Sequence, residues 1–186
     1  MRAINSLTPI LSLLPLALSI PHGRQVIHEF DLTELHGSFP TPGVYGTGAI
    51  ASSLSITVTY PDSSSTSGAN LTTTCSYAWS ASTGPGPTDW TACGDASVQW
   101  RLPTDGWSSD GNFRVELYQT LTADGAGLDA THYLTMNPGA TSDPNAYLSC
   151  IQMGKFTPII CQINGQLSVL RGPVVMYASE ETARPT

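Results

Sequence analysis

The stretch NFRVELYQTLT, residues 112–122, alternates apolar and polar side chains along its length. Successive side chains of a β-strand point to opposite faces of the sheet, so this alternation predicts a strand with one buried and one exposed face. A helix would repeat its apolar positions every three or four residues instead. No segment shows that helical period convincingly, although residues 33–39 could form one helical turn.

The same strand pattern recurs on both sides of this stretch. A first strand is predicted between His28 and His36, and further strands at residues 54–60, 97–103, 130–136, 157–163 and 166–178. The intervening turn dipeptides are Pro61-Asp62, Asp105-Gly106, Asp110-Gly111, Asp124-Gly125 and Asn164-Gly165. Such dipeptides favour tight hairpin turns, so the strands should form a meander. Because an open antiparallel sheet leaves unpaired edges, we expect an all-β fold, a single compact antiparallel β-barrel or a closely related β-sandwich.

The first nineteen residues have the pattern of a secretory signal peptide. A positive charge at Arg2 precedes the apolar run at residues 10–19, and Ala17 and Ser19 place small residues before the expected cleavage site. The apolar run is too short to cross a bilayer and Pro15 interrupts it, so a membrane anchor is not expected. The sequence therefore predicts a secreted, extracellular protein.

Cleavage would leave one domain. Removing residues 1–19 from the 186 leaves 167 residues, enough for a single β-barrel domain over residues 20–186 with flexible ends at 20–25 and 178–186. The net charge of −7 becomes −8 because Arg2 is lost, and Lys155 is the one lysine. This charge leaves no basic patch for nucleic acid or for an anionic membrane, so neither is expected as a partner.

Four cysteines are expected to form two disulfides in an oxidising compartment. Three pairings are possible. The pairing of Cys75 with Cys93 and of Cys150 with Cys161 is favoured because it closes short local loops, each bridge removing about 3 kcal/mol of loop-closure entropy from the unfolded chain. Zinc does not fit, because the sequence has no C-x-x-C spacing with a nearby histidine.

Aromatic side chains gather near the first cysteine pair. Tyr77 and Trp79 would share one face of a strand, and Trp90 lies beyond a loop rich in Ser, Thr, Gly and Pro. Two interpretations are open: the rings pack as core against the cystine, or they form a binding surface for a planar ligand or a partner protein. In the same region the sequon at Asn70 predicts N-glycosylation.

The patterns that define a catalytic or metal site are missing. His132 belongs to no metal-binding spacing and is predicted to be a half-exposed strand residue. There is no G-x-S-x-G nucleophile motif, and no cysteine stays free if both disulfides form. A glycosidase-like carboxylate pair could be drawn in principle from Glu29, Asp31, Glu34 and Glu116. The acids next to turns do not have calcium-loop spacing and are predicted to lie in hairpin turns: Asp105, Asp110, Asp124 and Asp129. We therefore expect no enzyme activity, no cofactor and no metal.

Several motifs, taken in order, resemble the secreted major-allergen family of Alternaria and its fungal relatives. The motifs are VIHEF (26–30), LTTTCSYAW (71–79), WTACG (90–94), SVQWRL (97–102), SCIQMG (149–154) and IICQINGQLSVL (159–170). They cover most of residues 25–175.

This resemblance implies a compact fungal β-barrel with disulfides Cys75–Cys93 and Cys150–Cys161 and no established enzyme activity. Members of the family act between fungus and plant as virulence-associated effectors, elicitors or allergens, and some bind thaumatin-like defence proteins or flavonoids. The allergen has a further cysteine near its mature N-terminus that links two chains. Residues 20–74 of the present sequence contain none, so a covalent dimer is not expected.

We therefore expect a secreted fungal effector or elicitor that binds a host extracellular protein, such as a thaumatin-like defence protein. Loops pre-organised by the disulfides would lose less conformational entropy on binding. Two alternatives remain open at this stage. A barrel that binds a planar phenolic, flavonoid-like molecule would need a dry interior cavity, and an extracellular hydrolase would need paired carboxylates in one cleft.

Overall fold

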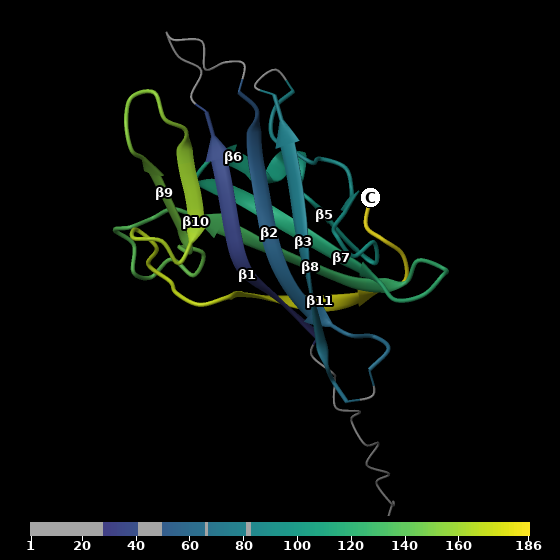
Figure 1. Ribbon diagram of the computed structural model, residues 1–186. Helices are drawn as coiled ribbons and strands as arrows, with labels where there is room; N and C mark the ends of the chain where they lie inside the picture. The colour runs from purple at the N-terminus through teal and green to yellow at the C-terminus, as the bar shows by residue number, and fades with distance from the viewer. Residues whose placement is uncertain (1–27, 41–49, 66, 81–82) are drawn as a thin grey trace, which may run out of the picture.

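The structure is a computed structural model that describes residues 28–40, 50–65, 67–80 and 83–186 (Figure 1). The predicted signal peptide and the expected flexible segment at 20–25 lie outside the described residues. The elements in chain order are β1 (His28–Phe39), β2 (Ser52–Pro61), β3 (Asn70–Trp79), β4 (Thr91–Ala92), β5 (Val98–Arg101), the 3-10 helix η2 (Thr104–Gly106), β6 (Trp107–Ser109), β7 (Asn112–Thr120), β8 (Gly127–Thr135), β9 (Leu148–Gln152), β10 (Ile159–Ile163) and β11 (Val174–Glu181). The predicted all-β class is confirmed.

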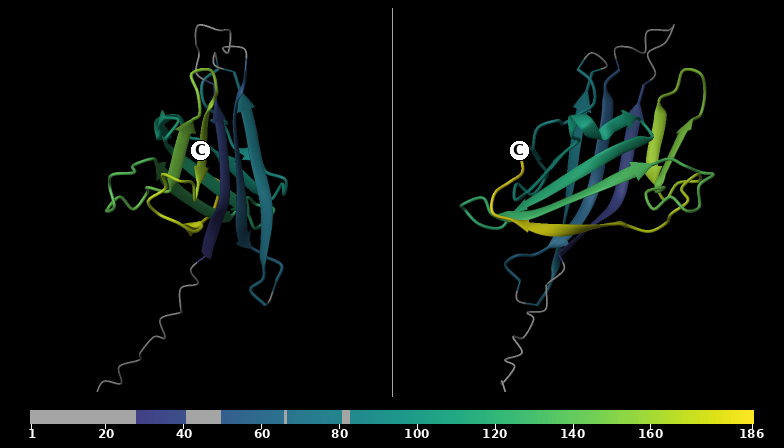
Figure 2. Two further views of the ribbon diagram at one scale, coloured as in Figure 1. Left: turned by 60° about the vertical axis from the view of Figure 1, so that its left-hand side comes forward. Right: turned by 180° about the vertical axis from the view of Figure 1, so that it is seen from behind.

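The strands form one antiparallel sheet in the order β3-β2-β1-β11-β8-β7-β5-β4, while β6 pairs with β7 and the β9–β10 hairpin pairs with β1 through β10. In Figure 2 the steep strands β1 to β3 cross the oblique strands β7, β8 and β11, so the sheet curls into a nearly closed barrel. The predicted barrel is therefore found. Its topology goes beyond a meander, because the last strand, β11, lies between the first strand and β8.

A β-bulge in β1 bends the sheet. Leu32 and Glu34 lie opposite consecutive residues of β2, so Thr33 is an extra residue in this strand. Buried side chains stand at even-numbered positions before Thr33 and at odd-numbered positions after it. The bent strand pairs with β11 over its first half and with β10 over its second half. Residues 33–39, for which one helical turn was considered, form the second half of this strand instead.

The two ends of the sheet meet at a seam between β3 and the β4–β5 turn. The Cys75–Cys93 disulfide crosses the seam, and the Gly94 amide donates a hydrogen bond of 2.8 Å to the Thr74 carbonyl. The Tyr60 hydroxyl donates a 2.5 Å hydrogen bond to Asp95 in that turn. This bond lowers the pKa of Asp95, while burial, followed by the bond to Asp95, raises the pKa of Tyr60 to about 12. Covalent and polar contacts together therefore join the two edges.

Large side chains fill the interior of the barrel. The bulkiest fully buried ones include Trp100, Tyr60, Phe30 and Phe113. At one end, Trp79 and Trp107 pack against each other with ring centroids 5.9 Å apart and with Phe39 at similar distances. Burial of this much apolar surface is the main favourable term in folding. The middle of the barrel is thus a packed core.

Most predicted strands lie close to their expected limits. The matches are 54–60 in β2, 98–101 in β5, 112–120 in β7, 130–135 in β8 and 159–163 in β10. Two boundaries are wrong. Residues 166–173 form turns, so only the second half of the predicted 166–178 strand exists. Residues 178–181, expected in a flexible tail, extend β11 instead, and residues 179–181 pair with β8.

Candidate functional site

The two disulfides have the favoured local pairing, Cys75–Cys93 and Cys150–Cys161. Their mechanical roles differ. The first joins β3 to the segment after β4 across the barrel seam, whereas the second links two directly paired residues of the β9–β10 hairpin. The predicted loop between residues 75 and 94 contains the end of β3 and all of β4.

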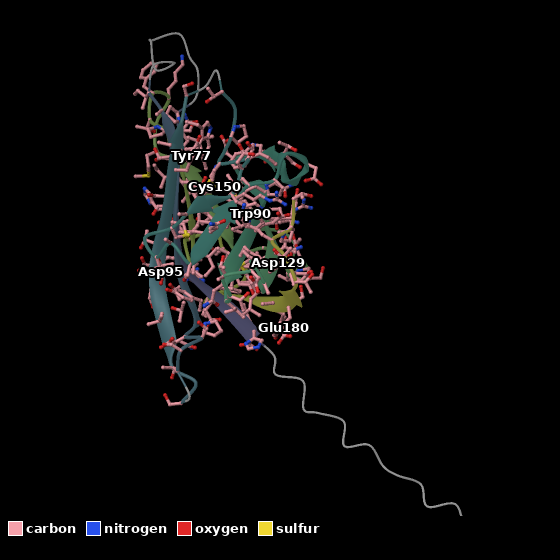
Figure 3. All side chains as sticks on the ribbon, turned by 90° about the vertical axis from the view of Figure 1, so that its right-hand side faces the viewer. Tyr77, Trp90, Asp95, Asp129, Cys150 and Glu180 are labelled. Atoms are coloured by element: carbon pink, nitrogen blue, oxygen red, sulfur yellow. A yellow bond between two sulfur atoms is a disulfide. The ribbon has the colours of Figure 1, made fainter. Side chains whose placement is uncertain are left out.

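The three aromatic residues predicted as a binding surface do not form one continuous surface. Trp79 is 8% exposed and belongs to the core. Tyr77 shares its face of β3, stacks on Trp79 at 6.4 Å and is 39% exposed. Trp90 packs instead against Arg101 of β5 and Tyr118 of β7, and it is labelled apart from Tyr77 in Figure 3. Core packing is therefore correct for Trp79, while Tyr77 and Trp90 keep accessible surface.

The four carboxylates of the hydrolase alternative do not all lie in one place. Glu29 and Asp31 line a depression beside the loop after β2, and Glu34 lines another between β1 and β10. Glu116 accepts a 2.6 Å hydrogen bond from Arg101 and forms an ion pair with Arg114 at 3.2 Å. A glycosidase needs two carboxyl groups on opposite sides of one substrate bond. Glu29 and Asp31 share one depression, whereas Glu34 and Glu116 lie elsewhere.

His132 lies in β8, as predicted, with its ring against Tyr147 and with a pKa lowered by burial. Three of the four acids assigned to turns lie in turns or in η2, but Asp129 lies within β8, so that assignment was wrong. Among the residues that the structure describes, no group of three or more His, Cys, Asp or Glu side chains could hold a metal ion.

The candidate site that the structure brings together is the β9–β10 hairpin and the cleft beside it. The hairpin stands at the side of β1 away from β2 (Figure 1). Its turn carries Met153, which is 86% exposed, and Phe156, which is 55% exposed. The amide of Gly154 donates to the Thr157 hydroxyl at 2.9 Å, and the Thr157 amide donates back to the Gly154 carbonyl at 3.1 Å. These bonds and the disulfide hold the two apolar side chains in a defined turn.

A cleft of about 670 Å³ separates the hairpin from the β6–β7 turn and the end of β8. Cys150, Gln152 and Ile159 form its hairpin side, and Asp110 lies opposite. The sulfur atoms of Cys150 and Cys161 lie 3.8 and 3.3 Å from the Asp110 main-chain oxygen. Since disulfide sulfurs carry no proton, these are packing contacts. They fix the hairpin to the body of the barrel.

The cleft is acidic. Burial raises the pKa of Asp110. The pKa of Asp143 is lowered, chiefly by a 2.7 Å hydrogen bond from the Thr135 hydroxyl and then by the Asn145 amide. None of the residues that line the cleft is Lys, Arg or His. The arrangement therefore suits a basic group of a partner, flanked by apolar surface.

Met153, Phe156 and Asp143 were not among the predicted site residues. One signal was present: the stretch Met153-Gly154-Lys155-Phe156 places two large apolar side chains in a turn between two cysteines. Turns are usually polar, so exposed apolar side chains in a turn are a signal of a binding surface. The cleft itself is made by segments distant in sequence and has no linear signal.

The sequon residue Asn70 is exposed at the first position of β3, where a glycan would have room. In the described part of the chain no helix is long and apolar enough to cross a membrane. Comparisons with protein-family models, with curated proteins and with solved structures find no match for this chain.

Proposed function

We propose that this protein is a secreted fungal effector or elicitor that works by binding a host extracellular protein, thereby triggering or modulating plant defence. The observation that carries the proposal is the stapled β9–β10 hairpin, which holds Met153 and Phe156 exposed beside an acidic cleft. Two disulfides and the signal-peptide pattern of residues 1–19 support secretion. The motif resemblance supports action at the boundary between fungus and plant.

The physical case for binding rests on pre-organisation. Burying an exposed Met or Phe side chain against a partner makes the free energy of binding more favourable, by about 25 cal/mol per Å² of apolar area. That gain is offset by any conformational entropy lost on association. The disulfide and the hydrogen bonds of the turn have already restricted the hairpin, so less entropy is lost there.

The negative charge of the chain and of the cleft restricts which partner proteins would bind. The chain carries a net charge of −7, and the cleft beside the hairpin contains Asp110 and Asp143. Complementary potentials speed encounter and suppress like-charged competitors. The partner therefore presents an apolar patch next to a basic side chain. A thaumatin-like defence protein is the specific candidate that the motif resemblance supplies.

The test is a direct affinity measurement between the purified, oxidised protein and an immobilised plant thaumatin-like protein. The double variant Met153→Ser, Phe156→Ser removes the apolar turn, and Tyr177→Ser is the matched control because Tyr177 is 68% exposed on β11. We expect the double variant to lose about tenfold or more in affinity, as for interface hot spots, and the control to bind normally.

Equal binding by all three proteins would overturn the role of the hairpin. Absence of binding by the unmodified protein would overturn this choice of partner. Raising the salt concentration provides a further check, since an acidic cleft that receives a basic group should lose affinity as charges are screened.

A further inference from the structure

A second surface lies on the outer face of β5 and β7, apart from the hairpin. Trp90 precedes β4, and its ring contacts the guanidinium of Arg101 at 4.5 Å and the ring of Tyr118 at 5.9 Å. Arg101 also donates a 2.6 Å hydrogen bond to Glu116, which fixes its orientation. Figure 3 places Trp90 over these strands, away from Tyr77 on β3. The result is a rigid platform with an aromatic face and oriented N–H donors.

The last residues of the chain occupy this platform. The indole Nε1 of Trp90 donates a 2.7 Å hydrogen bond to the Pro185 carbonyl, and Arg101 Nη2 donates a 3.0 Å bond to the main-chain oxygen of Thr186. Arg184 donates to the Gln99 side chain. In Figure 2 the segment after β11 turns back toward the β5 region. Pro185 is partly buried, whereas its two neighbours are exposed.

These contacts are of a general kind. The Trp90 bond goes to a peptide carbonyl, which any extended peptide offers, and the Arg101 bond goes to the main-chain oxygen of the next residue. An aromatic face with an N–H donor suits proline in particular, because a proline-containing segment is already extended and loses little entropy on binding. Beyond Thr186 the surface continues into a depression of about 330 Å³ lined by residues such as Thr88, Pro103 and Arg114.

We propose that Trp90, Gln99 and Arg101 form a binding surface for an extended, proline-containing segment of a partner protein, and that residues 184–186 of the chain occupy it as an internal competitor. The inference goes beyond the proposed function and does not depend on the hairpin. Three hydrogen bonds hold residues 184–186, which make no strand pairing. A partner segment can therefore displace them.

Fluorescence anisotropy of a labelled peptide with the sequence ETARPT tests this in the full chain. The variant Arg184→Ala, Pro185→Ala weakens the internal competitor, so it should bind the peptide more tightly than the unmodified chain. If the tail fills the surface about nine-tenths of the time, freeing it fully would improve the apparent affinity about tenfold. Adding Trp90→Phe, which keeps a ring but removes the N–H donor, should lower the affinity again.

Two control peptides complete the design. The peptide ETARAT, which lacks proline, should bind more weakly, and unlabelled APAPAP should compete with labelled ETARPT. Thermal melting verifies that each variant is folded. Equal affinity of the unmodified chain and the tail variant, no effect of Trp90→Phe, or no competition by APAPAP would each overturn the proposal.

Discussion

At the scale of single residues, the surroundings of Asp129 disfavour the ionised form of its carboxyl group. It lies in β8, beside β7 and β11, as the label in Figure 3 shows. Burial first, and then the carboxylates of Glu116 and Glu181, raise the pKa of Asp129 to about 6, while Arg101 acts in the opposite direction. The folded protein therefore binds a proton here at a pH where the unfolded chain, with an ordinary aspartate pKa near 4, has released it.

This makes the free energy of unfolding fall as pH rises through the interval from about 4 to about 6. Asp129→Asn removes that dependence. We expect the variant to gain stability relative to the unmodified protein on the order of 1 kcal/mol when the pH is raised from about 5 to about 7.5, allowing for solvent screening. Urea denaturation at both pH values measures the gain. A stability difference that does not change with pH would contradict the assignment.

At the scale of elements, β1 shows why the sequence predicted some strands along their whole length and others only in part. Strand β2 keeps a strict period of two and was predicted closely. In β1 the extra residue Thr33 moves the apolar positions from even to odd numbers, so the alternation breaks in the middle of the strand. The segment 33–39 then offered no clear strand signal. A bulge depends on pairing with distant strands, and local sequence does not show it.

The two disulfides lead to a prediction about their separate roles. Their loops have similar sequence separations of 18 and 11 residues, so each bridge should stabilise the fold by about 3 kcal/mol in the chain-entropy account. The double variant Cys75→Ser, Cys93→Ser should have a lower unfolding midpoint. Its folded molecules should still bind the partner with the affinity of the unmodified chain. Cys150→Ser, Cys161→Ser should lower partner affinity even where the barrel is folded. Denaturation curves and affinity measurements on both variants test this, and the reverse assignment would refute it.

At the scale of the whole molecule, the sequence predicted the class, the closure and the cystine pairing but not the contacts between distant segments. Short alternating strands and turn dipeptides were sufficient to predict a barrel or a closely related sandwich. The insertion of β11 between β1 and β8 was not predictable, because nothing local specifies pairing across so many residues. For the same reason the sequence did not predict the cleft between Asp110 and the hairpin, or the hydrogen bond from Trp90 to Pro185. Aromatic residues were identified as candidates, but only the fold separates the buried Trp79 from the accessible Trp90.

We propose that recognition through the β9–β10 hairpin gives this protein its biological effect. The most direct measurement is to infiltrate leaves with equal amounts of three purified, oxidised and verified folded proteins: the unmodified chain, Met153→Ser with Phe156→Ser, and the surface control Tyr177→Ser. Cell death and oxidative burst are scored across a dilution series. We predict that the unmodified chain and the control elicit the response at the same dose and that the double variant needs about tenfold more protein or fails. A double variant as active as the unmodified chain, or no response to any of the three across several host species, would contradict the claim.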